Sequence, residues 1–519
     1  MEKISFYKES RFRLIMISTF LWGFAAHGMA MLNKYSYHDD VPWFNGVGET
    51  YGLGRWSLGL SGKISEYFYC SRNYSLPLFN GILTILSVAL IVYILCRRLD
   101  IKNRVLLVAL SGVMVCFPAV TNIFGYSFTA PFYYFAALIG IIGALLYYTY
   151  DNIPSFIACS LLMAFSVGMY QSNIAINLSV MLLFMFQKIY ESDTNWKDYV
   201  ILALKNAALS AAFMAEYFIF NMAALKITGQ GMYDYKGVSS FGATDVTGYV
   251  QRVISAYKRF LKPADHINYN GVSANMFPWN LKYLHMLLVV ICFVLLVIIL
   301  KKIGSLRRII QLLVLAAVSP LFSYFLYVMV EQDHAHGGMA FGEAFMFVFA
   351  AYLIEQVSGN REKDTATGRT LSCLAGAAVT VMIIMGVMFT RFANVCYLKA
   401  DLMQAEAINY YNTLITRIRM TEGYTRETPV AYIGPREKND DDFSGNRLFD
   451  PIYLPPYQGN SIINDFSWEE TMNMWCSFSR VEADESDIAD WDTISLMPCY
   501  PDNGSVKMVD GILVVKFSD

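Results

Sequence analysis

The chain has 519 residues, of which 55% are hydrophobic and 16% are charged, with a formal net charge of −2 and a mean hydropathy of +0.39. This composition argues against a soluble globular protein, and no basic patch or motif suggests that the chain binds nucleic acid. It favours an α-helical polytopic membrane protein, in which apolar segments cross the bilayer.

About eleven apolar windows, most of them about 18–22 residues long, can cross a hydrocarbon core of roughly 30 Å. Two of them are short and are separated by Tyr170-Gln171. We therefore expect a bundle of about eleven transmembrane helices. The approximate bounds of the windows are 12–32, 76–96, 105–121, 131–149, 154–170, 173–187, 199–222, 281–300, 309–330, 339–355 and 370–390.

Basic residues lie before the first window and in alternate short loops, whereas the loops 122–130 and 331–338 contain no lysine or arginine. Because positive residues stay on the cytoplasmic side, we expect the N-terminus inside and, after an odd number of spans, the C-terminus outside. Cleavage of the first window as a signal peptide is a weaker alternative, because the window is too long. The basic residues are Lys3, Lys8, Arg11, Arg13, Arg97, Arg98, Lys102, Arg104, Lys301, Lys302, Arg307, Arg308, Arg361, Lys363 and Arg369.

Two regions follow from this topology: a catalytic membrane region at 1–390 and an extracytoplasmic C-terminal α/β domain at 391–519. Three loops of the membrane region, 33–75, 223–280 and 331–338, would face outward. They hold most of the polar groups that interrupt the apolar pattern, so we expect the chemistry at the outer face.

The C-terminal region combines helix and strand patterns. A helix is expected to continue to about Arg419, followed by a strand at 429–434 and a hairpin from Val506 to Phe517 around Asp510-Gly511. Cys476 and Cys499 lie in this outer region, where an oxidising compartment would allow them to pair or to remain free.

The second outer loop contains an amphipathic helix that ends at Pro263. One face would carry basic residues and lie against lipid phosphates, or the helix would cap the bundle with its charges in solvent. The apolar residues with helical spacing are Val250, Val253, Ile254, Tyr257, Phe260 and Leu261. The basic residues are Arg252, Lys258 and Arg259.

The sequence His38-Asp39-Asp40 follows the first window, and Gly54-Arg55-Trp56 follows on the same loop. Neighbouring carboxylates raise the pKa of one of them, which suits a general base, and arginine holds phosphate through a bidentate fork. A sugar transferase that uses a lipid phosphate needs both groups. Alternatively, Asp39 caps a solvated turn, and Arg55 anchors the interface together with Trp56.

Other polar and aromatic side chains could bind substrate. Trp43 and Trp56 suit stacking on sugars, and Arg252, Lys258, Arg259 and His336 are further candidates for donor phosphate. The remaining candidates are His38, Tyr170, Gln171, Glu331, Asp333 and His334. The alternatives are ordinary polar loop residues for the two loop histidines, and a buried hydrogen bond that closes a tight turn for Tyr170-Gln171.

Three motifs in order, Tyr37-His38-Asp39-Asp40, Gly54-Arg55-Trp56 and Gly168-Met169-Tyr170-Gln171-Ser172, resemble the Gtr type II glucosyl transferase family. These bacterial and phage membrane enzymes decorate surface polysaccharide, as in O-antigen serotype conversion. The resemblance spans most of the membrane region and is loose in the tail. Many relatives carry an arginine at the start of the span after the ninth, where this chain has His334-Ala335-His336-Gly337-Gly338.

The resemblance implies a GT-C-like glycosyltransferase of the bacterial cytoplasmic (inner) membrane. It implies transfer of a hexose, glucose by expectation, from polyprenyl (undecaprenyl) phosphate to a surface polysaccharide or its lipid-linked intermediate. Asp39 and Asp40 become the catalytic candidates and Arg55 the candidate for the donor phosphate. A donor-synthesising transferase, a donor flippase and membrane lipid are the implied partners.

No cofactor is required by this reading, and no CxxC or HExxH spacing indicates a metal site. A divalent cation, Mg²⁺ or Mn²⁺, stays open because paired acids such as Asp39 and Asp40 can serve as ligands as well as a base. The alternatives are a transferase with another sugar or acceptor and a flippase or transporter of lipid-linked glycans. A transporter needs charges within its spans, and Glu216 is the clearest one here.

Overall fold

The computed structural model describes residues 9–35, 38–233, 242–261, 263, 267–269, 272–274, 280–330, 337–359, 366–434, 452 and 467–519. The chain divides into two compact units. Among the described residues, the membrane unit contains those within 1–33 and 45–395 together with Ile452. The terminal unit contains those within 34–44, 396–434 and 467–519.

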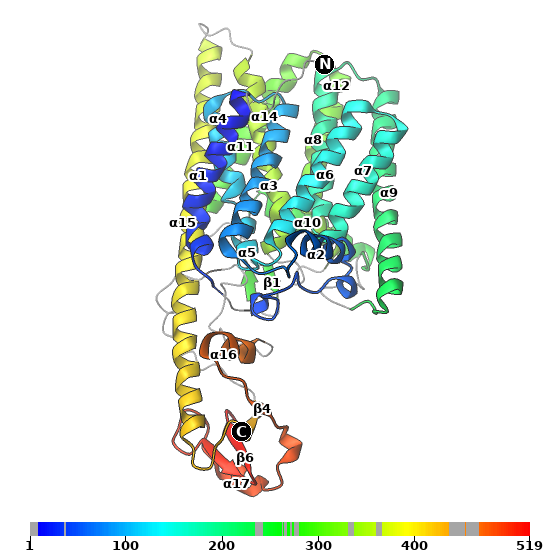
Figure 1. Ribbon diagram of the computed structural model, residues 1–519. Coiled ribbons are helices and arrows are strands. Elements are labelled where there is room, and N and C mark those ends of the chain that lie inside the picture. Colours follow the sequence, from blue (N-terminus) through cyan, green and yellow to red (C-terminus); the bar gives the residue numbers. More distant parts are fainter. Residues whose placement is uncertain are drawn as a thin grey trace. The chain divides into compact units, whose positions relative to one another are not determined.

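The membrane unit is a bundle of helices, and successive long helices run in opposite directions along it (Figure 1). Ten of the predicted apolar windows fall on one of these helices or on a consecutive pair, and the window 339–355 falls on α14 and the 3-10 helix η4 (Gly337–Ala344) that precedes it. This confirms the prediction of a polytopic helical protein. The helices are α1 (Ser10–Leu32), α3 (Pro77–Arg98), α4 (Arg104–Val115), α5 (Pro118–Phe124), α6 (Ala130–Tyr150), α7 (Ile153–Met169), α8 (Asn173–Glu191), α9 (Trp196–Thr228), α11 (Leu281–Ile303), α12 (Leu306–Ser323), α13 (Phe325–Met329), α14 (Phe345–Gly359) and α15 (Ala366–Met420).

Within the described residues, nine helices are long and apolar enough to cross a membrane alone. The helices α4 and α5 form a further span that is bent by 44° at their junction. Pro118 explains the break, because proline lacks an N–H donor and disfavours helical geometry in the residue before it. The remaining window is α7, which is shorter at 17 residues and separated from α8 by the turn at Tyr170.

Small residues let neighbouring helices approach closely. A Cβ atom at Gly143 of α6 would lie 3.3 Å from the carbonyl oxygen of Cys159 and 3.2 Å from Cβ of Leu162, both in α7. In a bilayer, where apolar surface gains little by leaving lipid, such close packing is a main source of helix association.

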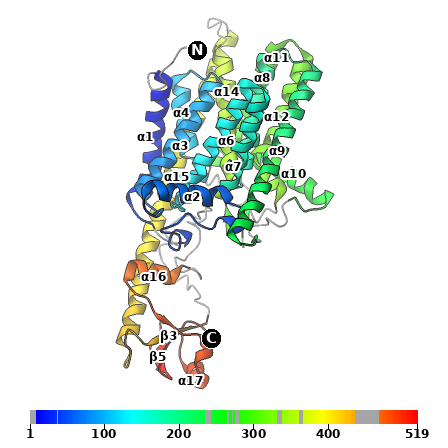
Figure 2. The same ribbon diagram turned by 45° about the vertical axis from the view of Figure 1, so that its right-hand side comes forward.

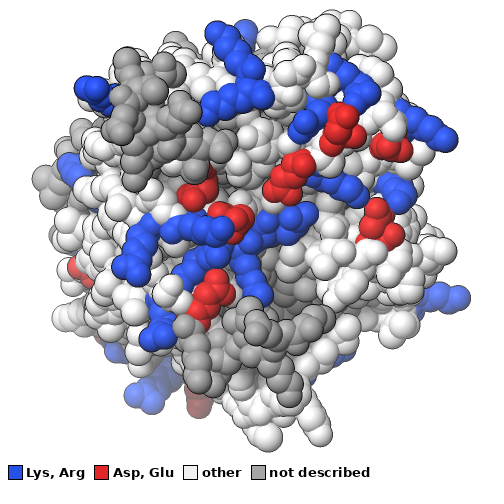
Figure 3. All heavy atoms as spheres, turned by 90° about the horizontal axis from the view of Figure 1, so that it is seen from above, with Lys and Arg blue, Asp and Glu red and all other residues white. Residues whose placement is uncertain are grey.

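One end of the membrane unit is rich in lysine and arginine (Figure 3). The basic side chains there form ion pairs across loops: Lys188 and Lys205 lie 3.2 and 2.8 Å from the two carboxylate oxygens of Asp151, and Arg307 lies 2.6 Å from Asp193. The loops at this end are those predicted to be cytoplasmic.

The opposite end carries the short elements on which the candidate site lies. Figure 2 shows α2 (Trp56–Tyr69) lying across the ends of the spans. The same end holds α10 (Val246–Leu261) and the 3-10 helices η3 (Tyr51–Leu53) and η4 (Gly337–Ala344). A short hairpin, β1 (Ile267–Tyr269) with β2 (Val272–Ala274), follows α10.

The terminal unit contains a four-stranded mixed sheet in the order β4-β3-β6-β5. Strand β3 is parallel to β4 and β6, whereas β5 and β6 form the predicted hairpin. The elements are β3 (Pro429–Ile433), α16 (Trp468–Cys476), β4 (Val481–Glu482), η7 (Glu485–Asp487), α17 (Trp491–Leu496), β5 (Val506–Val509) and β6 (Ile512–Lys516). The predicted α/β character is thus confirmed, and Cys476 and Cys499 are free thiols.

Candidate active site

The two candidate acids have different surroundings. Both lie in the 3-10 helix η2 (His38–Asp40) of the terminal unit. Asp40 is 1% exposed and forms an ion pair with Lys34. The Lys34 ammonium lies 5.4 Å from the centre of the Phe44 ring, and its burial lowers its pKa although Asp40 opposes that shift. Asp40 is thus the counter-ion of a lysine held within its own loop.

Asp39 is half-buried, and its carbonyl oxygen accepts a hydrogen bond from the backbone N–H of Trp43 at 3.2 Å. This bond closes the turn and places Trp43, also half-buried, one turn after the acid. Of the two acids, Asp39 is therefore the less buried. The side chain of His38 lies outside the described residues.

Arg55 lies in the membrane unit, at the point where the loop after η3 enters α2. Gly54 before it has a φ of 74°, and a Cβ atom there would lie 2.6 Å from the hydroxyl oxygen of Tyr217. Glycine is the residue that tolerates both this left-handed conformation and this close approach. The backbone N–H of Arg55 donates to the carbonyl of Thr50 at 2.8 Å, which fixes the turn.

The guanidinium of Arg55 meets two stacked tyrosines. The rings of Tyr133 and Tyr170 are nearly parallel, with centres 4.0 Å apart, and both side chains are buried. Arg55 lies 5.9 and 5.7 Å from the two ring centres, and its Nη1 donates to the hydroxyl of Tyr133 at 3.1 Å. The aromatic pair restrains a cation at this end of the bundle.

Gln171 and Trp56 make contacts within the bundle. The amide of Gln171 donates to the carbonyl of Leu53 at 2.6 Å, so the turn between α7 and α8 holds the loop that carries Arg55. The indole of Trp56 packs against Phe165, Phe220 and Gly168. These contacts favour the alternative of a buried hydrogen bond for Gln171 and a packing role for Trp56.

The helix α10 is formed as predicted, but its faces are oriented differently from either expectation. Arg252 and Arg259 are buried at 8% and 5% exposure, and only Lys258 of the three basic residues is exposed. Arg252, Ala256 and Arg259 share the inward face, whereas Val250 and Ile254 are exposed. Hydrophobic burial does not select the inward face in a bilayer, because lipid can cover apolar side chains.

Arg259 has a counter-ion inside the bundle. Its guanidinium lies 4.5 Å from the ring centre of Tyr327, and it interacts with the carboxylate of Glu343. Glu343, in η4, also interacts with the hydroxyl groups of Tyr324 and Tyr327. The Nη1 atom of Arg252 differs, because it has no hydrogen-bond partner in the described part of the chain.

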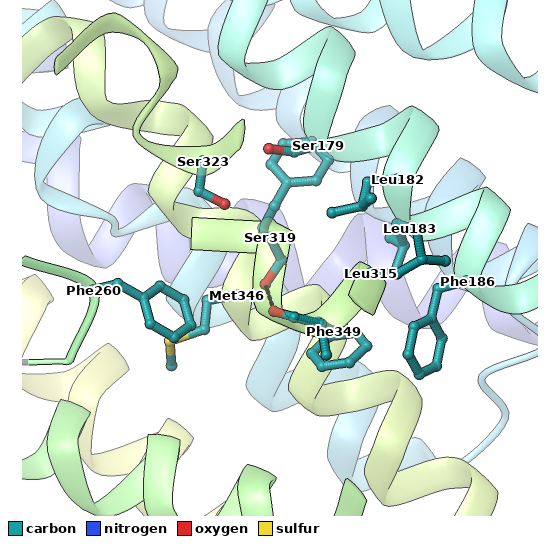
Figure 4. Close-up of a pocket in the computed structure, with 12 residues that line it drawn as sticks. Ser179, Leu182, Leu183, Phe186, Phe260, Leu315, Ser319, Ser323, Met346 and Phe349 are labelled. Atoms are coloured by element: carbon teal, nitrogen blue, oxygen red, sulfur yellow. Dashed lines mark hydrogen bonds between the residues drawn. The ribbon is translucent and has the colours of Figure 1, made fainter. Parts of the chain in front are cut away.

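Next to Arg259, Phe260 covers an apolar crevice between α8, α12 and α14 (Figure 4). The crevice has a volume of about 50 Å³, and Ser319 at its wall donates to the carbonyl of Ala316. This space is too small to hold a sugar, so the crevice is not a candidate for the substrate site.

Glu331, Asp333, His334 and His336 lie outside the described residues, so their predicted roles stay predictions. Among the residues that are described, no three His, Cys, Asp or Glu side chains lie close enough together to hold a metal ion.

A family model for glucosyl transferase GtrII matches residues 28–349, which is more than half of the chain. The chain belongs to the GtrII glucosyl transferase family. It is therefore a membrane glycosyltransferase, in agreement with the resemblance seen in the three motifs. No curated protein matches the chain.

The GtrII match begins within α1 and ends within α14, so it includes Asp39, Arg55, Gln171, Arg252 and Glu343. The match does not include α15, which follows α14, or the sheet of the terminal unit. The family relationship thus covers every candidate site residue that the motifs identified.

Sequence reasoning missed two side chains of this GtrII protein that contact the candidates, and it identified a third, Glu343, only as one of the polar residues at 331–343. Lys34 pairs with Asp40, Tyr133 binds Arg55, and Glu343 faces Arg259. Tyr133 was hidden inside an apolar window. Glu343 could be noticed from its place at a window boundary, but its interaction with Arg259 required the structure.

Proposed function

We propose that the protein transfers glucose from a polyprenyl phosphate, such as undecaprenyl phosphate, to a surface polysaccharide or its lipid-linked intermediate. The reaction takes place on the outer face of the bacterial cytoplasmic membrane, in the manner of a GT-C glycosyltransferase. Membership of the family supports glucosyl transfer. The arrangement of charged side chains supports a lipid-phosphate donor and a reaction on the outer face of the membrane.

The observation that carries the donor class is the burial of Arg252 without a partner for Nη1 among the described residues. Burying a guanidinium is costly unless an anion compensates it. Arg259 interacts with Glu343, whereas Nη1 of Arg252 has no hydrogen-bond partner among the described residues, and we assign it to a phosphate oxygen of the donor. The exposed apolar face of α10 keeps this arginine at the boundary of the lipid, where a lipid phosphate would be found.

The side of the reaction follows from charge. Lysine and arginine gather at the end of the bundle opposite α2 and α10 (Figure 3). The end with more positive loops is expected in the cytoplasm, so Arg55 and Arg252 face outward.

Asp39 is the proposed general base, and Asp40 is a structural counter-ion for Lys34. The carboxylate of Asp39 takes the proton of the acceptor hydroxyl, whose oxygen forms a bond to the anomeric carbon of glucose. The bond between that carbon and the phosphate oxygen breaks, and the electron pair leaves with the polyprenyl phosphate. Arg252 and Arg55 stabilise the charge of the departing phosphate, and the single displacement inverts the anomeric centre.

Steady-state kinetics of Arg252→Ala with polyprenyl-phosphate glucose as varied substrate tests the donor site. Loss of one charge-assisted phosphate contact should raise the KM for the donor about tenfold. Lys258→Ala, on the same helix but exposed, is the matched control and should leave KM unchanged. Equal effects of the two substitutions, or none, would show that α10 does not bind the donor phosphate.

A further inference from the structure

A second feature of the membrane unit is a groove of about 580 Å³ between α3 and α6. Its floor is apolar and includes Phe79, Leu83 and Leu90 of α3 and Phe135 of α6. Phe79 and Phe135 are 44% and 45% exposed although both belong to membrane spans. The groove therefore opens toward lipid.

Polar groups gather at one end of the groove, in the segment that connects α2 to α3. Ser71, Arg72 and Asn73 lie there, and Arg72 is exposed. Asn73 is fixed, because its amide donates to the carbonyl of Gly62 at 2.8 Å. A cation at the head of an apolar groove that opens to the bilayer matches a lipid with an anionic headgroup.

The groove is long enough to span one leaflet. From Leu76 to Leu90 the helix α3 rises by roughly 21 Å at 1.5 Å per residue. One leaflet of a hydrocarbon core of about 30 Å is roughly 15 Å thick. The groove thus accommodates one extended acyl chain with its headgroup at the interface, whereas a polyprenyl chain is several times longer.

The groove is separate from the candidate active site. Pro131, Phe135 and Leu138 line it at helical spacing and therefore share one face of α6. Tyr133, which binds Arg55, lies two residues after Pro131 and so projects from the opposite face. The helix α6 lies between the groove and Arg55.

We propose that this groove binds one acyl chain of an anionic glycerophospholipid whose phosphate contacts Arg72. The site goes beyond sugar transfer and does not depend on the proposed donor. A bound lipid would fill the open space beside α2 and stabilise the connection that links this helix to the bundle.

Native mass spectrometry of the purified full-length protein, titrated with dioleoyl phosphatidylglycerol or dioleoyl phosphatidylcholine, tests the proposal. The wild type should bind one phosphatidylglycerol about fivefold more tightly than phosphatidylcholine. Arg72→Ala should abolish this preference, and Leu83→Trp, which fills the groove, should weaken binding of both lipids at least about fivefold.

Two substitutions serve as matched controls. Leu78 lies on α3 and is exposed but does not line the groove, and Arg104 is an exposed cation at the first residue of α4. Leu78→Trp and Arg104→Ala should therefore bind phosphatidylglycerol like the wild type. Binding that Leu83→Trp leaves intact, or a lipid preference that survives Arg72→Ala, would overturn the proposal.

The polyprenyl chain of the donor is the competing occupant. Undecaprenyl phosphate without sugar should fail to displace the bound phosphatidylglycerol from the wild type. Stoichiometric displacement that is lost in Leu83→Trp would assign the groove to the donor chain and refute the phospholipid. Because the readout is lipid binding, failure of this proposal leaves the proposed transferase activity untouched.

Discussion

Adjacent carboxylates in one loop have different consequences when they are removed. Asp40 is buried and forms an ion pair with the half-buried Lys34, so we propose an electrostatic role for it. Asp39 is the less buried residue of the two, and we propose it for proton transfer. The sequence predicted a functional pair but could not divide the roles, because the partner Lys34 is selected by the path of the loop and not by spacing.

Asp39→Asn should therefore lower kcat by about 10²–10⁴, which is the usual cost of losing a general base. Its thermal unfolding midpoint should stay close to that of the wild type. A variant with wild-type kcat would remove Asp39 from the catalytic mechanism.

Asp40→Asn should act mainly on stability, because it removes the carboxylate charge that pairs with the half-buried Lys34 ammonium. The expected cost is about 3 kcal/mol, measured as a lower thermal unfolding midpoint in detergent. The double variant Lys34→Met with Asp40→Leu should recover most of this loss. A stable Asp40→Asn that has lost catalysis would reverse the assignment of the two acids.

At the level of elements, α10 shows that the periodicity of a sequence predicts a helix but not the orientation of its faces in a membrane protein. The 3.6-residue pattern correctly predicted a helix, yet it gave no means to decide which face turns inward. In water the apolar face would be buried, but here Val250 and Ile254 are exposed while Arg252 and Arg259 turn toward the bundle, an arrangement that lipid on the apolar face would stabilise. The motif at 168–172 was similarly located by sequence, but its hydrogen bond to the carbonyl of Leu53 required the tertiary structure.

The packing of α2 on α7 gives a test at this scale. A Cβ atom at Gly168 would lie 2.3 Å from Nε1 of Trp56, so Gly168→Ala must displace the indole. We expect a loss of about 1–3 kcal/mol in stability, measured by thermal unfolding. Gly231→Ala is the control, because no atom lies within 4 Å of the added methyl group, and it should cost little. Equal unfolding midpoints for the two variants would mean that α2 does not pack as described.

At the scale of the whole molecule, the order of apolar windows and basic loops was sufficient to predict the bundle. Each window became a helix or a helix pair, because a chain in lipid must satisfy its backbone hydrogen bonds within each crossing. What could not be predicted was the assignment of residues 34–44 to the terminal unit, because it depends on contacts between segments far apart in sequence.

The orientation of the bundle can be checked with a native thiol. Cys70 follows α2 and is exposed, whereas Lys102 lies in the basic loop between α3 and α4. The other cysteines that are not buried, Cys373, Cys476 and Cys499, are first replaced by serine. In right-side-out membrane vesicles with this variant, a membrane-impermeant maleimide should label Cys70. After Cys70→Ser is added, the maleimide should fail to label Lys102→Cys until the vesicles are permeabilised. The reverse pattern would place the candidate site in the cytoplasm.

The central claim is transfer of glucose from a polyprenyl phosphate. The most direct measurement follows undecaprenyl-phosphate glucose and released undecaprenyl phosphate by mass spectrometry, with purified protein and surface glycan acceptor. The wild type should consume this donor and transfer glucose to the acceptor with inversion, Asp39→Asn should not, and UDP-glucose should not substitute as donor. Turnover of UDP-glucose with no consumption of the lipid-linked donor would contradict the account.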